Sequence, residues 1–471
     1  MTLVRRTSHV LRPDATRVVS TPFLPGEEIH GAGVSRRAAV LGRLLALTDA
    51  EVDSALIDVL TSFSTRHDDL VGMLDARFAL VEGHIQDSTL LSLERRRLIG
   101  ACMSQEYAIE SAALFNPSMV AHPDQGGLPA GSVRFVMSVR GVGEGHVSCV
   151  ELRTGVVDVV GELTFDDVGA TTSVPRRLET VHAREDLLRQ NDELGGDRDG
   201  ADALLRSLPA TFPSEAVQGS PRLEWLAACT YGVVFPADSA VHSRVLLPGS
   251  PAERNGIEDL RLVEVEATDG RRSYLGTYTA FDGEAVAPHL LATDDFRSFR
   301  MTRLTGPGAK NKGMALFPRR VGGRYLALSR WDRENNSLAA STDLQHWDDL
   351  GTLTAPVHPW EIIQAGNCGS PLETPAGWLV LTHGVGPMRQ YGIGAMLLDL
   401  DDPRRVLGSL SEPLLSPAPD ERDGYVPNVV YSCGALRHGS TLVLPYGCSD
   451  ATVRVALVDV PQLLALLAAA R

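Results

Sequence analysis

The 471-residue chain is predicted to be mainly β, a five-bladed β-propeller preceded by a helical N-terminal extension. Three observations support this fold class. Helical periodicity is confined almost entirely to the first part of the chain, short alternating runs typical of strands follow it, and one turn signature recurs within the strand-rich part. The predicted units are an N-terminal arm with a helical extension (1–110), the propeller (111–460) and a short C-terminal helix (461–471).

The N-terminal unit is predicted to hold an extended arm and roughly four helices. Residues 1–35 are rich in Arg, Pro, Thr and Gly and show no sustained period. Apolar residues then recur at three- and four-residue spacing, and Thr48 and Ser88 occupy positions typical of helix N-caps. We expect the helical region to end at Pro117, because proline restricts the residue before it. The expected helices cover 35–47, 48–64, 70–83 and 88–113.

Strands are predicted for most of the remaining chain. Apolar runs bounded by Gly, Asp and Pro turns include residues 134–140, 273–279, 324–328 and 377–381. Two stretches depart from this pattern, since 173–195 is expected to form a charged helix or loop and 461–471 a short closing helix.

The recurring turn signature predicts the architecture. Residues 292–299 resemble residues 340–347, and the alignment pairs Asp295 with Asp343 at an offset of 48 residues. A hairpin signature that recurs at roughly 40–50 residues is typical of propeller blades. The strand-rich part is long enough for five blades.

Composition favours a small neutral ligand. The formal net charge of -15 argues against a general grip on nucleic acid or on an anionic membrane. No apolar run approaches the roughly 20 residues that cross a bilayer, and the N-terminus lacks the apolar core of a secretory signal. The six cysteines form no CxxC or Cys/His cluster, so we expect reduced, mostly buried thiols in a cytoplasmic protein without a metal site or organic cofactor.

The stretch from Glu253 to Arg261 carries the densest charge. Its sequence, ERNGIEDLR, places three carboxylates and two guanidinium groups around a glycine, directly before an alternating run. Such charges either pair in a solvated loop or, at the mouth of a sheet, have shifted pKa values.

Several motifs in the same order resemble glycoside hydrolase family 130, the inverting mannoside phosphorylases and β-mannosidases on a five-bladed propeller. The resemblance covers roughly 110–460. The segments that carry it are SVR (138–140), GHVS (145–148), NGIEDLR (255–261), NKGMALFP (311–318), GNCGSP (366–371), THGV (382–385), LLDLDDP (397–403), YVPNVV (425–430) and YGCSD (446–450). The chain departs from the family where Leu260 replaces a proline and where the helical region is longer than in compact members.

Cleavage of a glycosidic bond requires a carboxylic acid of raised pKa that protonates the leaving oxygen. Asp259 is the predicted acid, and Glu258 is expected to raise its pKa by like-charge repulsion, while Arg261 and Arg254 act in the opposite direction or hold its neighbours. The resemblance implies that the proton passes through a sugar hydroxyl. Glu258 has a second interpretation, as a partner of Arg261 that fixes the loop.

The nucleophile separates two reactions. Water would need a second carboxylate as base, whereas phosphate would need a cluster of cations. The resemblance implies that Arg140, Lys312 and His383 bind phosphate, and Arg330 is a fourth candidate. Phosphate is therefore the predicted co-substrate.

Polar groups and one aromatic ring are expected to hold the sugar. The predicted substrate-binding residues are Asn116, Asp124, Asn255, Glu258, Arg261, Tyr446 and Asp450. Trp360 is the alternative to Tyr446 as the stacking ring, whereas Trp347 and Trp378 are expected to pack in the core.

The predicted function is phosphorolysis of a β-mannoside oligosaccharide to α-mannose 1-phosphate. Two alternatives remain, a β-mannosidase that uses water and a sugar-binding propeller without catalysis. The helical extension is expected to form a homo-oligomer contact or a lid over the site.

Overall fold

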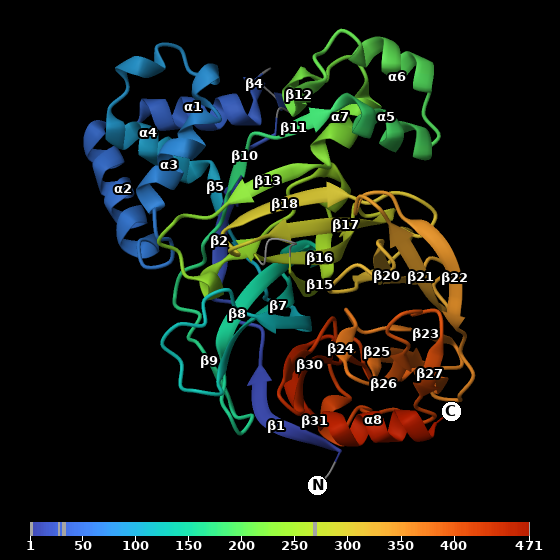
Figure 1. The fold of residues 1–471 in the computed structure, drawn as a ribbon. Coiled ribbons are helices and arrows are strands. Elements are labelled where there is room, and N and C mark those ends of the chain that lie inside the picture. The colour runs from blue at the N-terminus through green and yellow to red at the C-terminus, as the bar shows by residue number, and fades with distance from the viewer. Residues whose placement is uncertain (1–2, 27–28, 31–33, 267–270, 471) are drawn as a thin grey trace. The chain divides into compact units, whose positions relative to one another are not determined.

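Strands predominate in the structure, a computed structural model that describes residues 3–26, 29–30, 34–266 and 271–470 (Figure 1). The mainly β prediction is therefore confirmed. The chain forms two units. The larger comprises residues 1–13, 112–167 and 174–471, and the smaller comprises 14–111 and 168–173.

Four helices build most of the smaller unit, drawn in blue in Figure 1: α1 (Arg36–Ala46), α2 (Asp49–Phe63), α3 (Leu70–Ala79) and α4 (Leu93–Cys102). Thr48 caps α2, because its side chain accepts from the Glu51 amide while Glu51 bonds back to the Thr48 amide. Ser88 was wrongly predicted as the cap of the last helix, since Ser92 accepts from the Arg95 amide instead. A small sheet of β2 (Val18–Pro22) and β5 (Ser104–Ala108) completes the unit beside the short pair β3 (Ile29–His30) and β4 (Val34–Ser35).

The last helix is shorter than the sequence predicted. It ends at Cys102, and Pro117 lies within strand β6 (Ala113–Ala121) instead of ending a helix. The register between β6 and β7 (Val133–Val142) shifts between Phe115 and Ser118. At such an irregularity a proline leaves no ladder hydrogen bond unmade, which is why β6 tolerates it.

The largest sheet of the larger unit has eleven strands, in the order β10-β13-β18-β17-β16-β15-β8-β7-β6, with β9 and β14 paired to β8. Two antiparallel groups meet in it through a single parallel pairing of Gly256 with Ser148. The remaining strands are β8 (Ser148–Val157), β9 (Leu163–Phe165), β10 (Arg176–Leu178), β13 (Tyr231–Val234), β14 (Val245–Leu246), β15 (Gly256–Glu266), β16 (Arg272–Phe281), β17 (Val286–Thr293) and β18 (Ser298–Arg303).

Three further antiparallel sheets follow along the chain. The first contains β19 (Ala315–Leu316), β20 (Tyr325–Ser329), β21 (Asn336–Ser341) and β22 (Asp348–Thr354). The second contains β23 (Gln364–Asn367), β24 (Leu372–Thr374), β25 (Gly377–Val385), β26 (Tyr391–Leu398) and β27 (Val406–Ser409). The third contains β28 (Val430–Tyr431), β29 (Leu436–His438), β30 (Thr441–Cys448), β31 (Thr452–Asp459) and, as its edge, the N-terminal β1 (Val4–Leu11).

The recurring turn signature corresponds to a recurring structure. The carboxylate of Asp295 accepts from the backbone amides two and three residues further on at 2.8 and 2.9 Å, and Asp343 makes the same two bonds at the same distances. The aromatic residue four positions after each aspartate, Phe299 and Trp347, is buried. The repeat is therefore a repeat of local geometry between two pairs of strands.

The chain ends in a helix, as predicted. This helix, α8 (Val460–Ala469), packs so closely on β27 that a Cβ on Gly408 would lie 1.9 Å from the Leu467 carbonyl oxygen.

Helices also interrupt the strands in the middle of the chain. The charged stretch 173–195 contains β10, β11 (Val181–Ala183) and α5 (Arg184–Glu193). The sequence did not predict the helices α6 (Arg198–Leu205) and α7 (Pro221–Ala228). A helix of eight residues contains about two turns, which is too few for a helical pattern of apolar residues to stand out. Both helices share an apolar core with α5 and with Phe212 of β12 (Thr211–Pro213), the strand that pairs with β11.

Candidate functional site

One pocket of about 200 Å³ in the larger unit brings together residues from widely separated parts of the chain. It is lined by seven of the twelve residues that the sequence proposed for the site: Asn116, Arg140, Asp259, Lys312, Arg330, His383 and Asp450. Six further residues complete the lining, and the sequence did not predict them: Gln364, Arg389, Tyr391, Val426, Val429 and Tyr431.

Unusual backbone conformations direct three polar side chains into this pocket. Asn116, Asp259 and Asp450 have φ angles of 49°, 56° and 47°, in the left-handed region that non-glycine residues rarely adopt. The register of β15 against β16 shifts between Glu258 and Arg261, at the position of Asp259. Residues held in such conformations cost free energy and cluster at functional sites. Strand irregularities thus place the polar groups where a regular ladder could not.

Asp259 is held in a cationic environment. Its Oδ1 accepts from Asn116 Nδ2 at 2.7 Å and from Arg140 NH1 at 3.1 Å, and its side chain is 13% exposed. Burial acts to raise the pKa of Asp259, but the charges of Arg140, Lys312 and Arg261 outweigh it and hold that pKa well below its ordinary range. The expectation that Asp259 has a raised pKa is therefore wrong.

Glu258 bridges two of the predicted phosphate ligands. Its Oε1 accepts from Arg140 NH2 at 2.6 Å, and its Oε2 accepts from the Lys312 ammonium. The alternative interpretation paired Glu258 with Arg261, but Glu258 instead pairs with Arg140 and Lys312. Arg140 is fixed further by a 2.9 Å hydrogen bond from its Nε to Ser148 Oγ. A buried carboxylate thus holds two cations at the edge of the pocket.

His383 and Arg330 contact each other. Arg330 NH1 lies within hydrogen-bond distance of His383 Nε2, and His383 Nδ1 lies 3.2 Å from the Asn367 carbonyl oxygen. Burial, reinforced by the charges of Arg330 and Arg261, holds the pKa of His383 well below its ordinary value. The imidazole is therefore neutral, and the expectation that His383 adds a positive charge is wrong. A neutral ring that donates from Nδ1 to the Asn367 carbonyl oxygen accepts a hydrogen bond from Arg330 NH1 at Nε2.

Arg261 lies buried behind the pocket. It donates from NH2 to Tyr431 Oη at 2.6 Å and from NH1 to the Asp259 carbonyl oxygen at 3.2 Å. The Tyr431 ring packs edge-on against His383, with 4.9 Å between ring centroids, and the Tyr391 ring stacks parallel to His383 at 6.1 Å. The sequence missed both tyrosines, because each is a single aromatic residue at a strand end without a distinguishing motif.

Asp450 is the second carboxylate of the pocket. Burial and the neighbouring charge of Asp259 raise its pKa to about 6, despite the opposing charge of Arg140. Two carboxyl groups of one pocket therefore have pKa values displaced in opposite directions. Such separation is typical of sites that assign different protonation states to two acids.

Five predicted sugar ligands lie outside the lining of this pocket: Glu258 and Arg261, described above, and Asp124, Asn255 and Tyr446. The Asp124 side chain is 72% exposed and accepts from the Gly126 amide within its own turn. Asn255 precedes β15 and bonds through its backbone to Phe281. Tyr446 is fully buried in the core and donates to Glu421 at 2.6 Å, so it presents no face to a ligand and was wrongly predicted as the stacking ring. Its alternative, Trp360, lines a different cavity.

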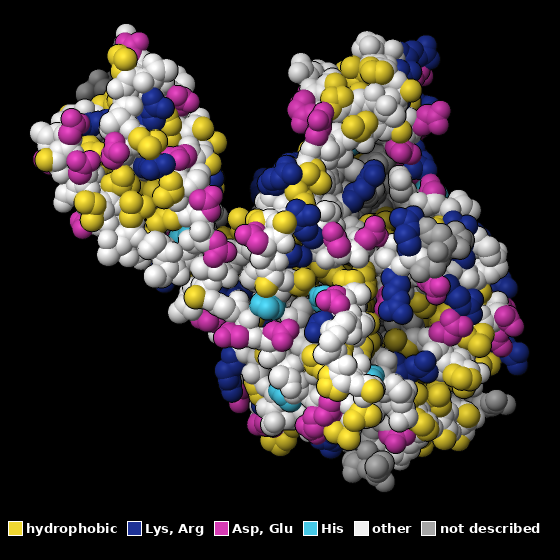
Figure 2. All heavy atoms as spheres, turned by 60° about the vertical axis from the view of Figure 1, so that its left-hand side comes forward, with side chains coloured by type: hydrophobic (Ala, Val, Ile, Leu, Met, Phe, Trp, Pro, Cys, Tyr) yellow, Lys and Arg dark blue, Asp and Glu magenta, His cyan; other side chains and the backbone are white. Residues whose placement is uncertain are grey.

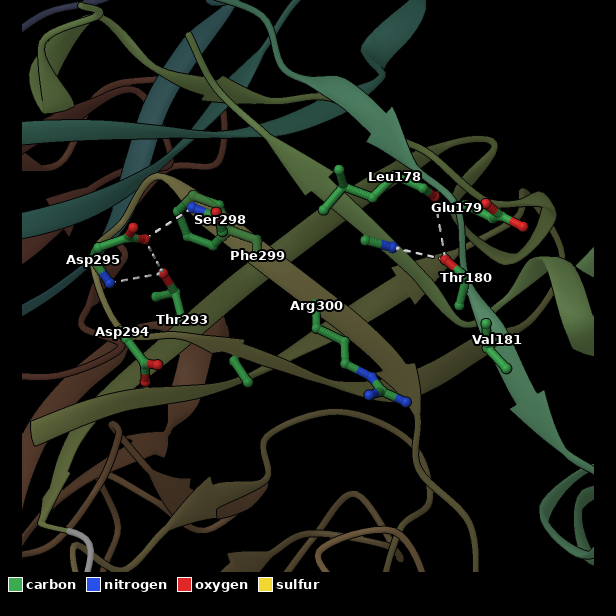
Figure 3. Close-up of a pocket in the computed structure, with 12 residues that line it drawn as sticks. Leu178, Glu179, Thr180, Val181, Thr293, Asp294, Asp295, Ser298, Phe299 and Arg300 are labelled. Carbon is green, nitrogen blue, oxygen red and sulfur yellow. Dashed lines mark hydrogen bonds between the residues drawn. The ribbon is translucent and has the colours of Figure 1, made fainter. Parts of the chain in front are cut away.

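A larger cavity of about 590 Å³ lies elsewhere in this unit, between β10, β13 and the turn from β17 to β18 (Figure 3). Its polar groups already serve the local fold: the Gly232 amide donates to Thr180 Oγ1, and Asp295 closes the recurring turn described above. The basic residue of this cavity, Arg300, is exposed. The smaller pocket, with converging acids and cations, is therefore the candidate active site.

The chain is similar to known carbohydrate phosphorylases. A family model described as beta-1,4-mannooligosaccharide phosphorylase matches residues 228–469. A 1,2-beta-oligomannan phosphorylase from Thermoanaerobacter sp. (strain X514) is 30% identical over 220 residues, which cover 45% of this chain and 71% of that protein. A beta-1,2-mannobiose phosphorylase from Listeria innocua is 33% identical over 218 residues, which cover 44% of this chain and 59% of that protein, less than two thirds of its length.

Solved structures are also similar. A structure of beta-1,2-mannobiose phosphorylase from Listeria innocua in complex with beta-1,2-mannobiose aligns with a TM-score of 0.45 at 23% identity, covering 77% of this chain and 93% of that one.

Within the described part of the chain, each helix is too short or too polar to cross a membrane.

Proposed function

Because this chain belongs to glycoside hydrolase family 130, we propose that it is an inverting phosphorylase that cleaves a β-mannoside with inorganic phosphate and releases α-mannose 1-phosphate. The observation that carries this proposal is the convergence of Asp259 with Arg140, Lys312 and Arg330 on one small pocket. A hydrolase of the same stereochemistry needs a carboxylate that activates water, whereas a phosphorylase needs positive charge for the attacking anion.

The proposed chemistry assigns one role to each group. Phosphate binds against Arg140, Lys312 and Arg330, and one of its oxygens attacks the anomeric carbon from the face opposite the leaving group. As the bond to the leaving oxygen breaks, a proton that originates on Asp259 passes to that oxygen through a sugar hydroxyl. The configuration at the anomeric carbon inverts because a single displacement occurs.

The neutral His383 acts on Arg330 in this proposal. Its Nε2 fixes the orientation of the guanidinium, so that the remaining donors of Arg330 are free to face an anion. Arg389 lines the same pocket and adds a further positive charge at its edge. For the sugar, Asn116 and Asp450 supply polar contacts, and Tyr391 replaces Tyr446 as the proposed aromatic surface.

We also propose that five groups of strands in the larger unit, apart from the short pair β11 and β12, are the five blades of a propeller. The eleven-stranded sheet divides into two antiparallel groups, around β6–β8 and β15–β18, and three separate sheets follow. The pocket draws a lining residue from each of the five groups or from a loop that adjoins it: Arg140, Asp259, Arg330, His383 and Asp450. A pocket lined by every sheet in succession is typical of the central cavity of a propeller.

The phosphate dependence of turnover tests the proposal. Purified protein is incubated with β-1,2-, β-1,3- and β-1,4-mannobiose, each with and without phosphate. The relatives named above make β-1,2-mannobiose the first substrate to examine. We expect disappearance of at least one mannobiose only when phosphate is present. Release of free mannose at the same rate without phosphate would identify a β-mannosidase, and binding without turnover of any mannoside would indicate a sugar-binding protein.

The helical unit is proposed to mediate self-association. Hydrophobic side chains are exposed among charged ones on its surface (Figure 2), and Ile57 and Leu90 are 62% and 83% exposed. A contiguous exposed apolar surface is typical of protein contacts, and Ile57 and Leu90 are the proposed members of such a surface. We expect Ile57→Lys with Leu90→Lys to lower the mass measured by light scattering, whereas Asp53→Lys on the same helix as Ile57 leaves it unchanged. A wild-type protein that is monomeric at every concentration contradicts this role.

A further inference from the structure

Of the cations that would bind phosphate, Arg140 donates a hydrogen bond to the Asp259 carboxylate, and Lys312 lowers the pKa of Asp259 through its charge. We propose that phosphate binding and protonation of Asp259 are one coupled event: the free pocket keeps Asp259 ionised, and the acid takes up its proton only when an anion occupies the neighbouring cations. This inference rests on the proposed phosphorolysis. It adds that phosphate must bind before Asp259 carries the proton that the leaving group needs.

The geometry makes the coupling direct. Arg140 uses its three nitrogens on three different partners, since NH1 donates to Asp259 at 3.1 Å, NH2 to Glu258 at 2.6 Å and Nε to Ser148 at 2.9 Å. Lys312 reaches the other oxygen of Glu258. These two cations therefore bond to protein carboxylates. An anion that binds them must share their charge with Asp259.

The groups that act on Asp259 come from every part of the structure around it. Arg140 from β7, Arg261 from β15 and Lys312 from the loop before β19 favour its ionised form, as does the hydrogen bond from Asn116 on β6. Two carboxyl groups are its acidic neighbours, Glu258 on its own strand and Asp450 on the turn between β30 and β31. His383 on β25 is neutral, and burial raises the pKa of the Cys433 thiol so that it is neutral too.

Two opposing influences act on the pKa of Asp259. Burial is the largest influence on the pKa of Asp259 and acts to raise it, whereas the three cations together lower it. A bound dianion would offset the effect of Arg140 and Lys312 and would add a like charge beside Asp259. Like charges in one site favour the neutral form of a carboxyl group. With the cations offset, burial and repulsion act in the same direction and Asp259 binds a proton.

The proton balance is complete without another reactant. Monohydrogen phosphate binds and one proton from solvent joins the Asp259 carboxylate. During the displacement the phosphate oxygen–carbon bond forms, the glycosidic bond breaks, and this proton reaches the leaving oxygen. The sugar monophosphate then loses the proton that phosphate carried, so the reaction as a whole neither gains nor loses protons. Without an anion Asp259 stays ionised, which disfavours hydrolysis by water.

Proton uptake on anion binding tests the coupling. The full-length protein is titrated with inorganic phosphate by calorimetry at about pH 8, in two buffers of different ionisation enthalpy, and the number of protons taken up per bound anion is calculated from the difference. We expect uptake of about one proton in the wild-type protein and almost none in Asp259→Asn. Asp450→Asn removes the other titrating carboxyl group of the pocket: uptake that persists in this variant assigns the proton to Asp259, whereas loss of the uptake would place the proton on Asp450 and overturn the proposal.

Sulfate serves as the second probe, since it carries no proton near neutral pH. Uptake with sulfate as well as phosphate supports the proposal, whereas uptake with phosphate alone would place the proton on the anion and overturn it. Absence of uptake in the wild-type protein, or equal uptake in Asp259→Asn, would also overturn it. If Asp259→Asn does not fold, Lys312→Gln replaces it and should take up less than the wild-type amount. Failure of phosphate to bind at all contradicts the proposed phosphorolysis instead.

Discussion

Asn116 and Asp259 are 143 residues apart in the sequence, and the Asn116 amide donates a 2.7 Å hydrogen bond to the Asp259 carboxylate. Both residues have left-handed backbone conformations at irregular positions of their strands. The position of the proposed acid therefore depends on two strained segments that support each other. A change at Asn116 should act on catalysis through the orientation of Asp259.

Asn116→Ala should lower kcat/KM by roughly 10- to 100-fold, because a displaced catalytic group loses much of its rate advantage. Steady-state kinetics with the active mannobiose measures the effect. Asn335→Ala is the control, since that amide bonds to Asp332 within its own loop. Equal activity of the two variants would show that Asn116 does not position the acid.

Asp259→Asn should reduce kcat by about 10²- to 10⁴-fold, the usual contribution of a general acid. Binding of the mannobiose, measured by calorimetry, should persist because the remaining lining is intact. Asp282→Asn is the matched control, since that carboxylate accepts from backbone amides in the turn between β16 and β17. Undiminished turnover in Asp259→Asn would exclude the role assigned to this residue.

Tyr278→Phe should lower the free energy of unfolding by about 1.5–3 kcal/mol, the range for a buried hydrogen bond to a charged group. Its hydroxyl donates to the buried carboxylate of Glu253, which also accepts from Tyr231 at 2.8 Å. Tyr274→Phe is the control on the same strand, because among the described residues its buried hydroxyl has no hydrogen-bond partner. We expect that variant to differ from wild type by less than about 0.5 kcal/mol in denaturant unfolding. Equal losses in the two variants would contradict this account of Glu253.

Asp450 should make stability depend on pH. Its pKa is raised from 3.8 to about 6 in the folded protein, so the folded state binds more protons than the unfolded state between these values. Stability from this group is therefore present at low pH and is lost as pH rises from about 4 to about 6. The stability of Asp450→Asn relative to wild type should rise across that window and stay constant above it. If the difference in stability between Asp450→Asn and wild type is the same at every pH, the pKa of Asp450 is not raised in the folded protein.

Seven of the twelve predicted site residues line the candidate pocket, and most of these seven occur in short motifs that the sequence identifies. Asp259 and Arg140 lie in runs that the sequence identifies, and the pocket brings them to 3.1 Å. The charge states were harder to predict. The pKa of Asp259 is depressed mainly by Arg140 and Lys312, which are distant in sequence, together with Arg261. His383 is neutral because of burial and the nearby charges of Arg330 and Arg261. The sequence does not show which distant residues come close in the folded chain.

Tertiary context also explains the errors in the fold. Pro117 is a strong helix-ending signal, but here it occupies an irregular position in a strand. Tyr446 belongs to a motif of the family, yet its ring is buried and its hydroxyl donates to Glu421. Aromatic residues in strands serve the core more often than a ligand, and only the structure shows which face each ring occupies.

Phosphorus and proton NMR of the reaction with β-1,2-mannobiose and phosphate test the central claim most directly. The proposal predicts that α-mannose 1-phosphate accumulates in equal amount to the free mannose released from the other half of the disaccharide. Formation of two mannose molecules per disaccharide, with the inorganic phosphate signal unchanged, would contradict it.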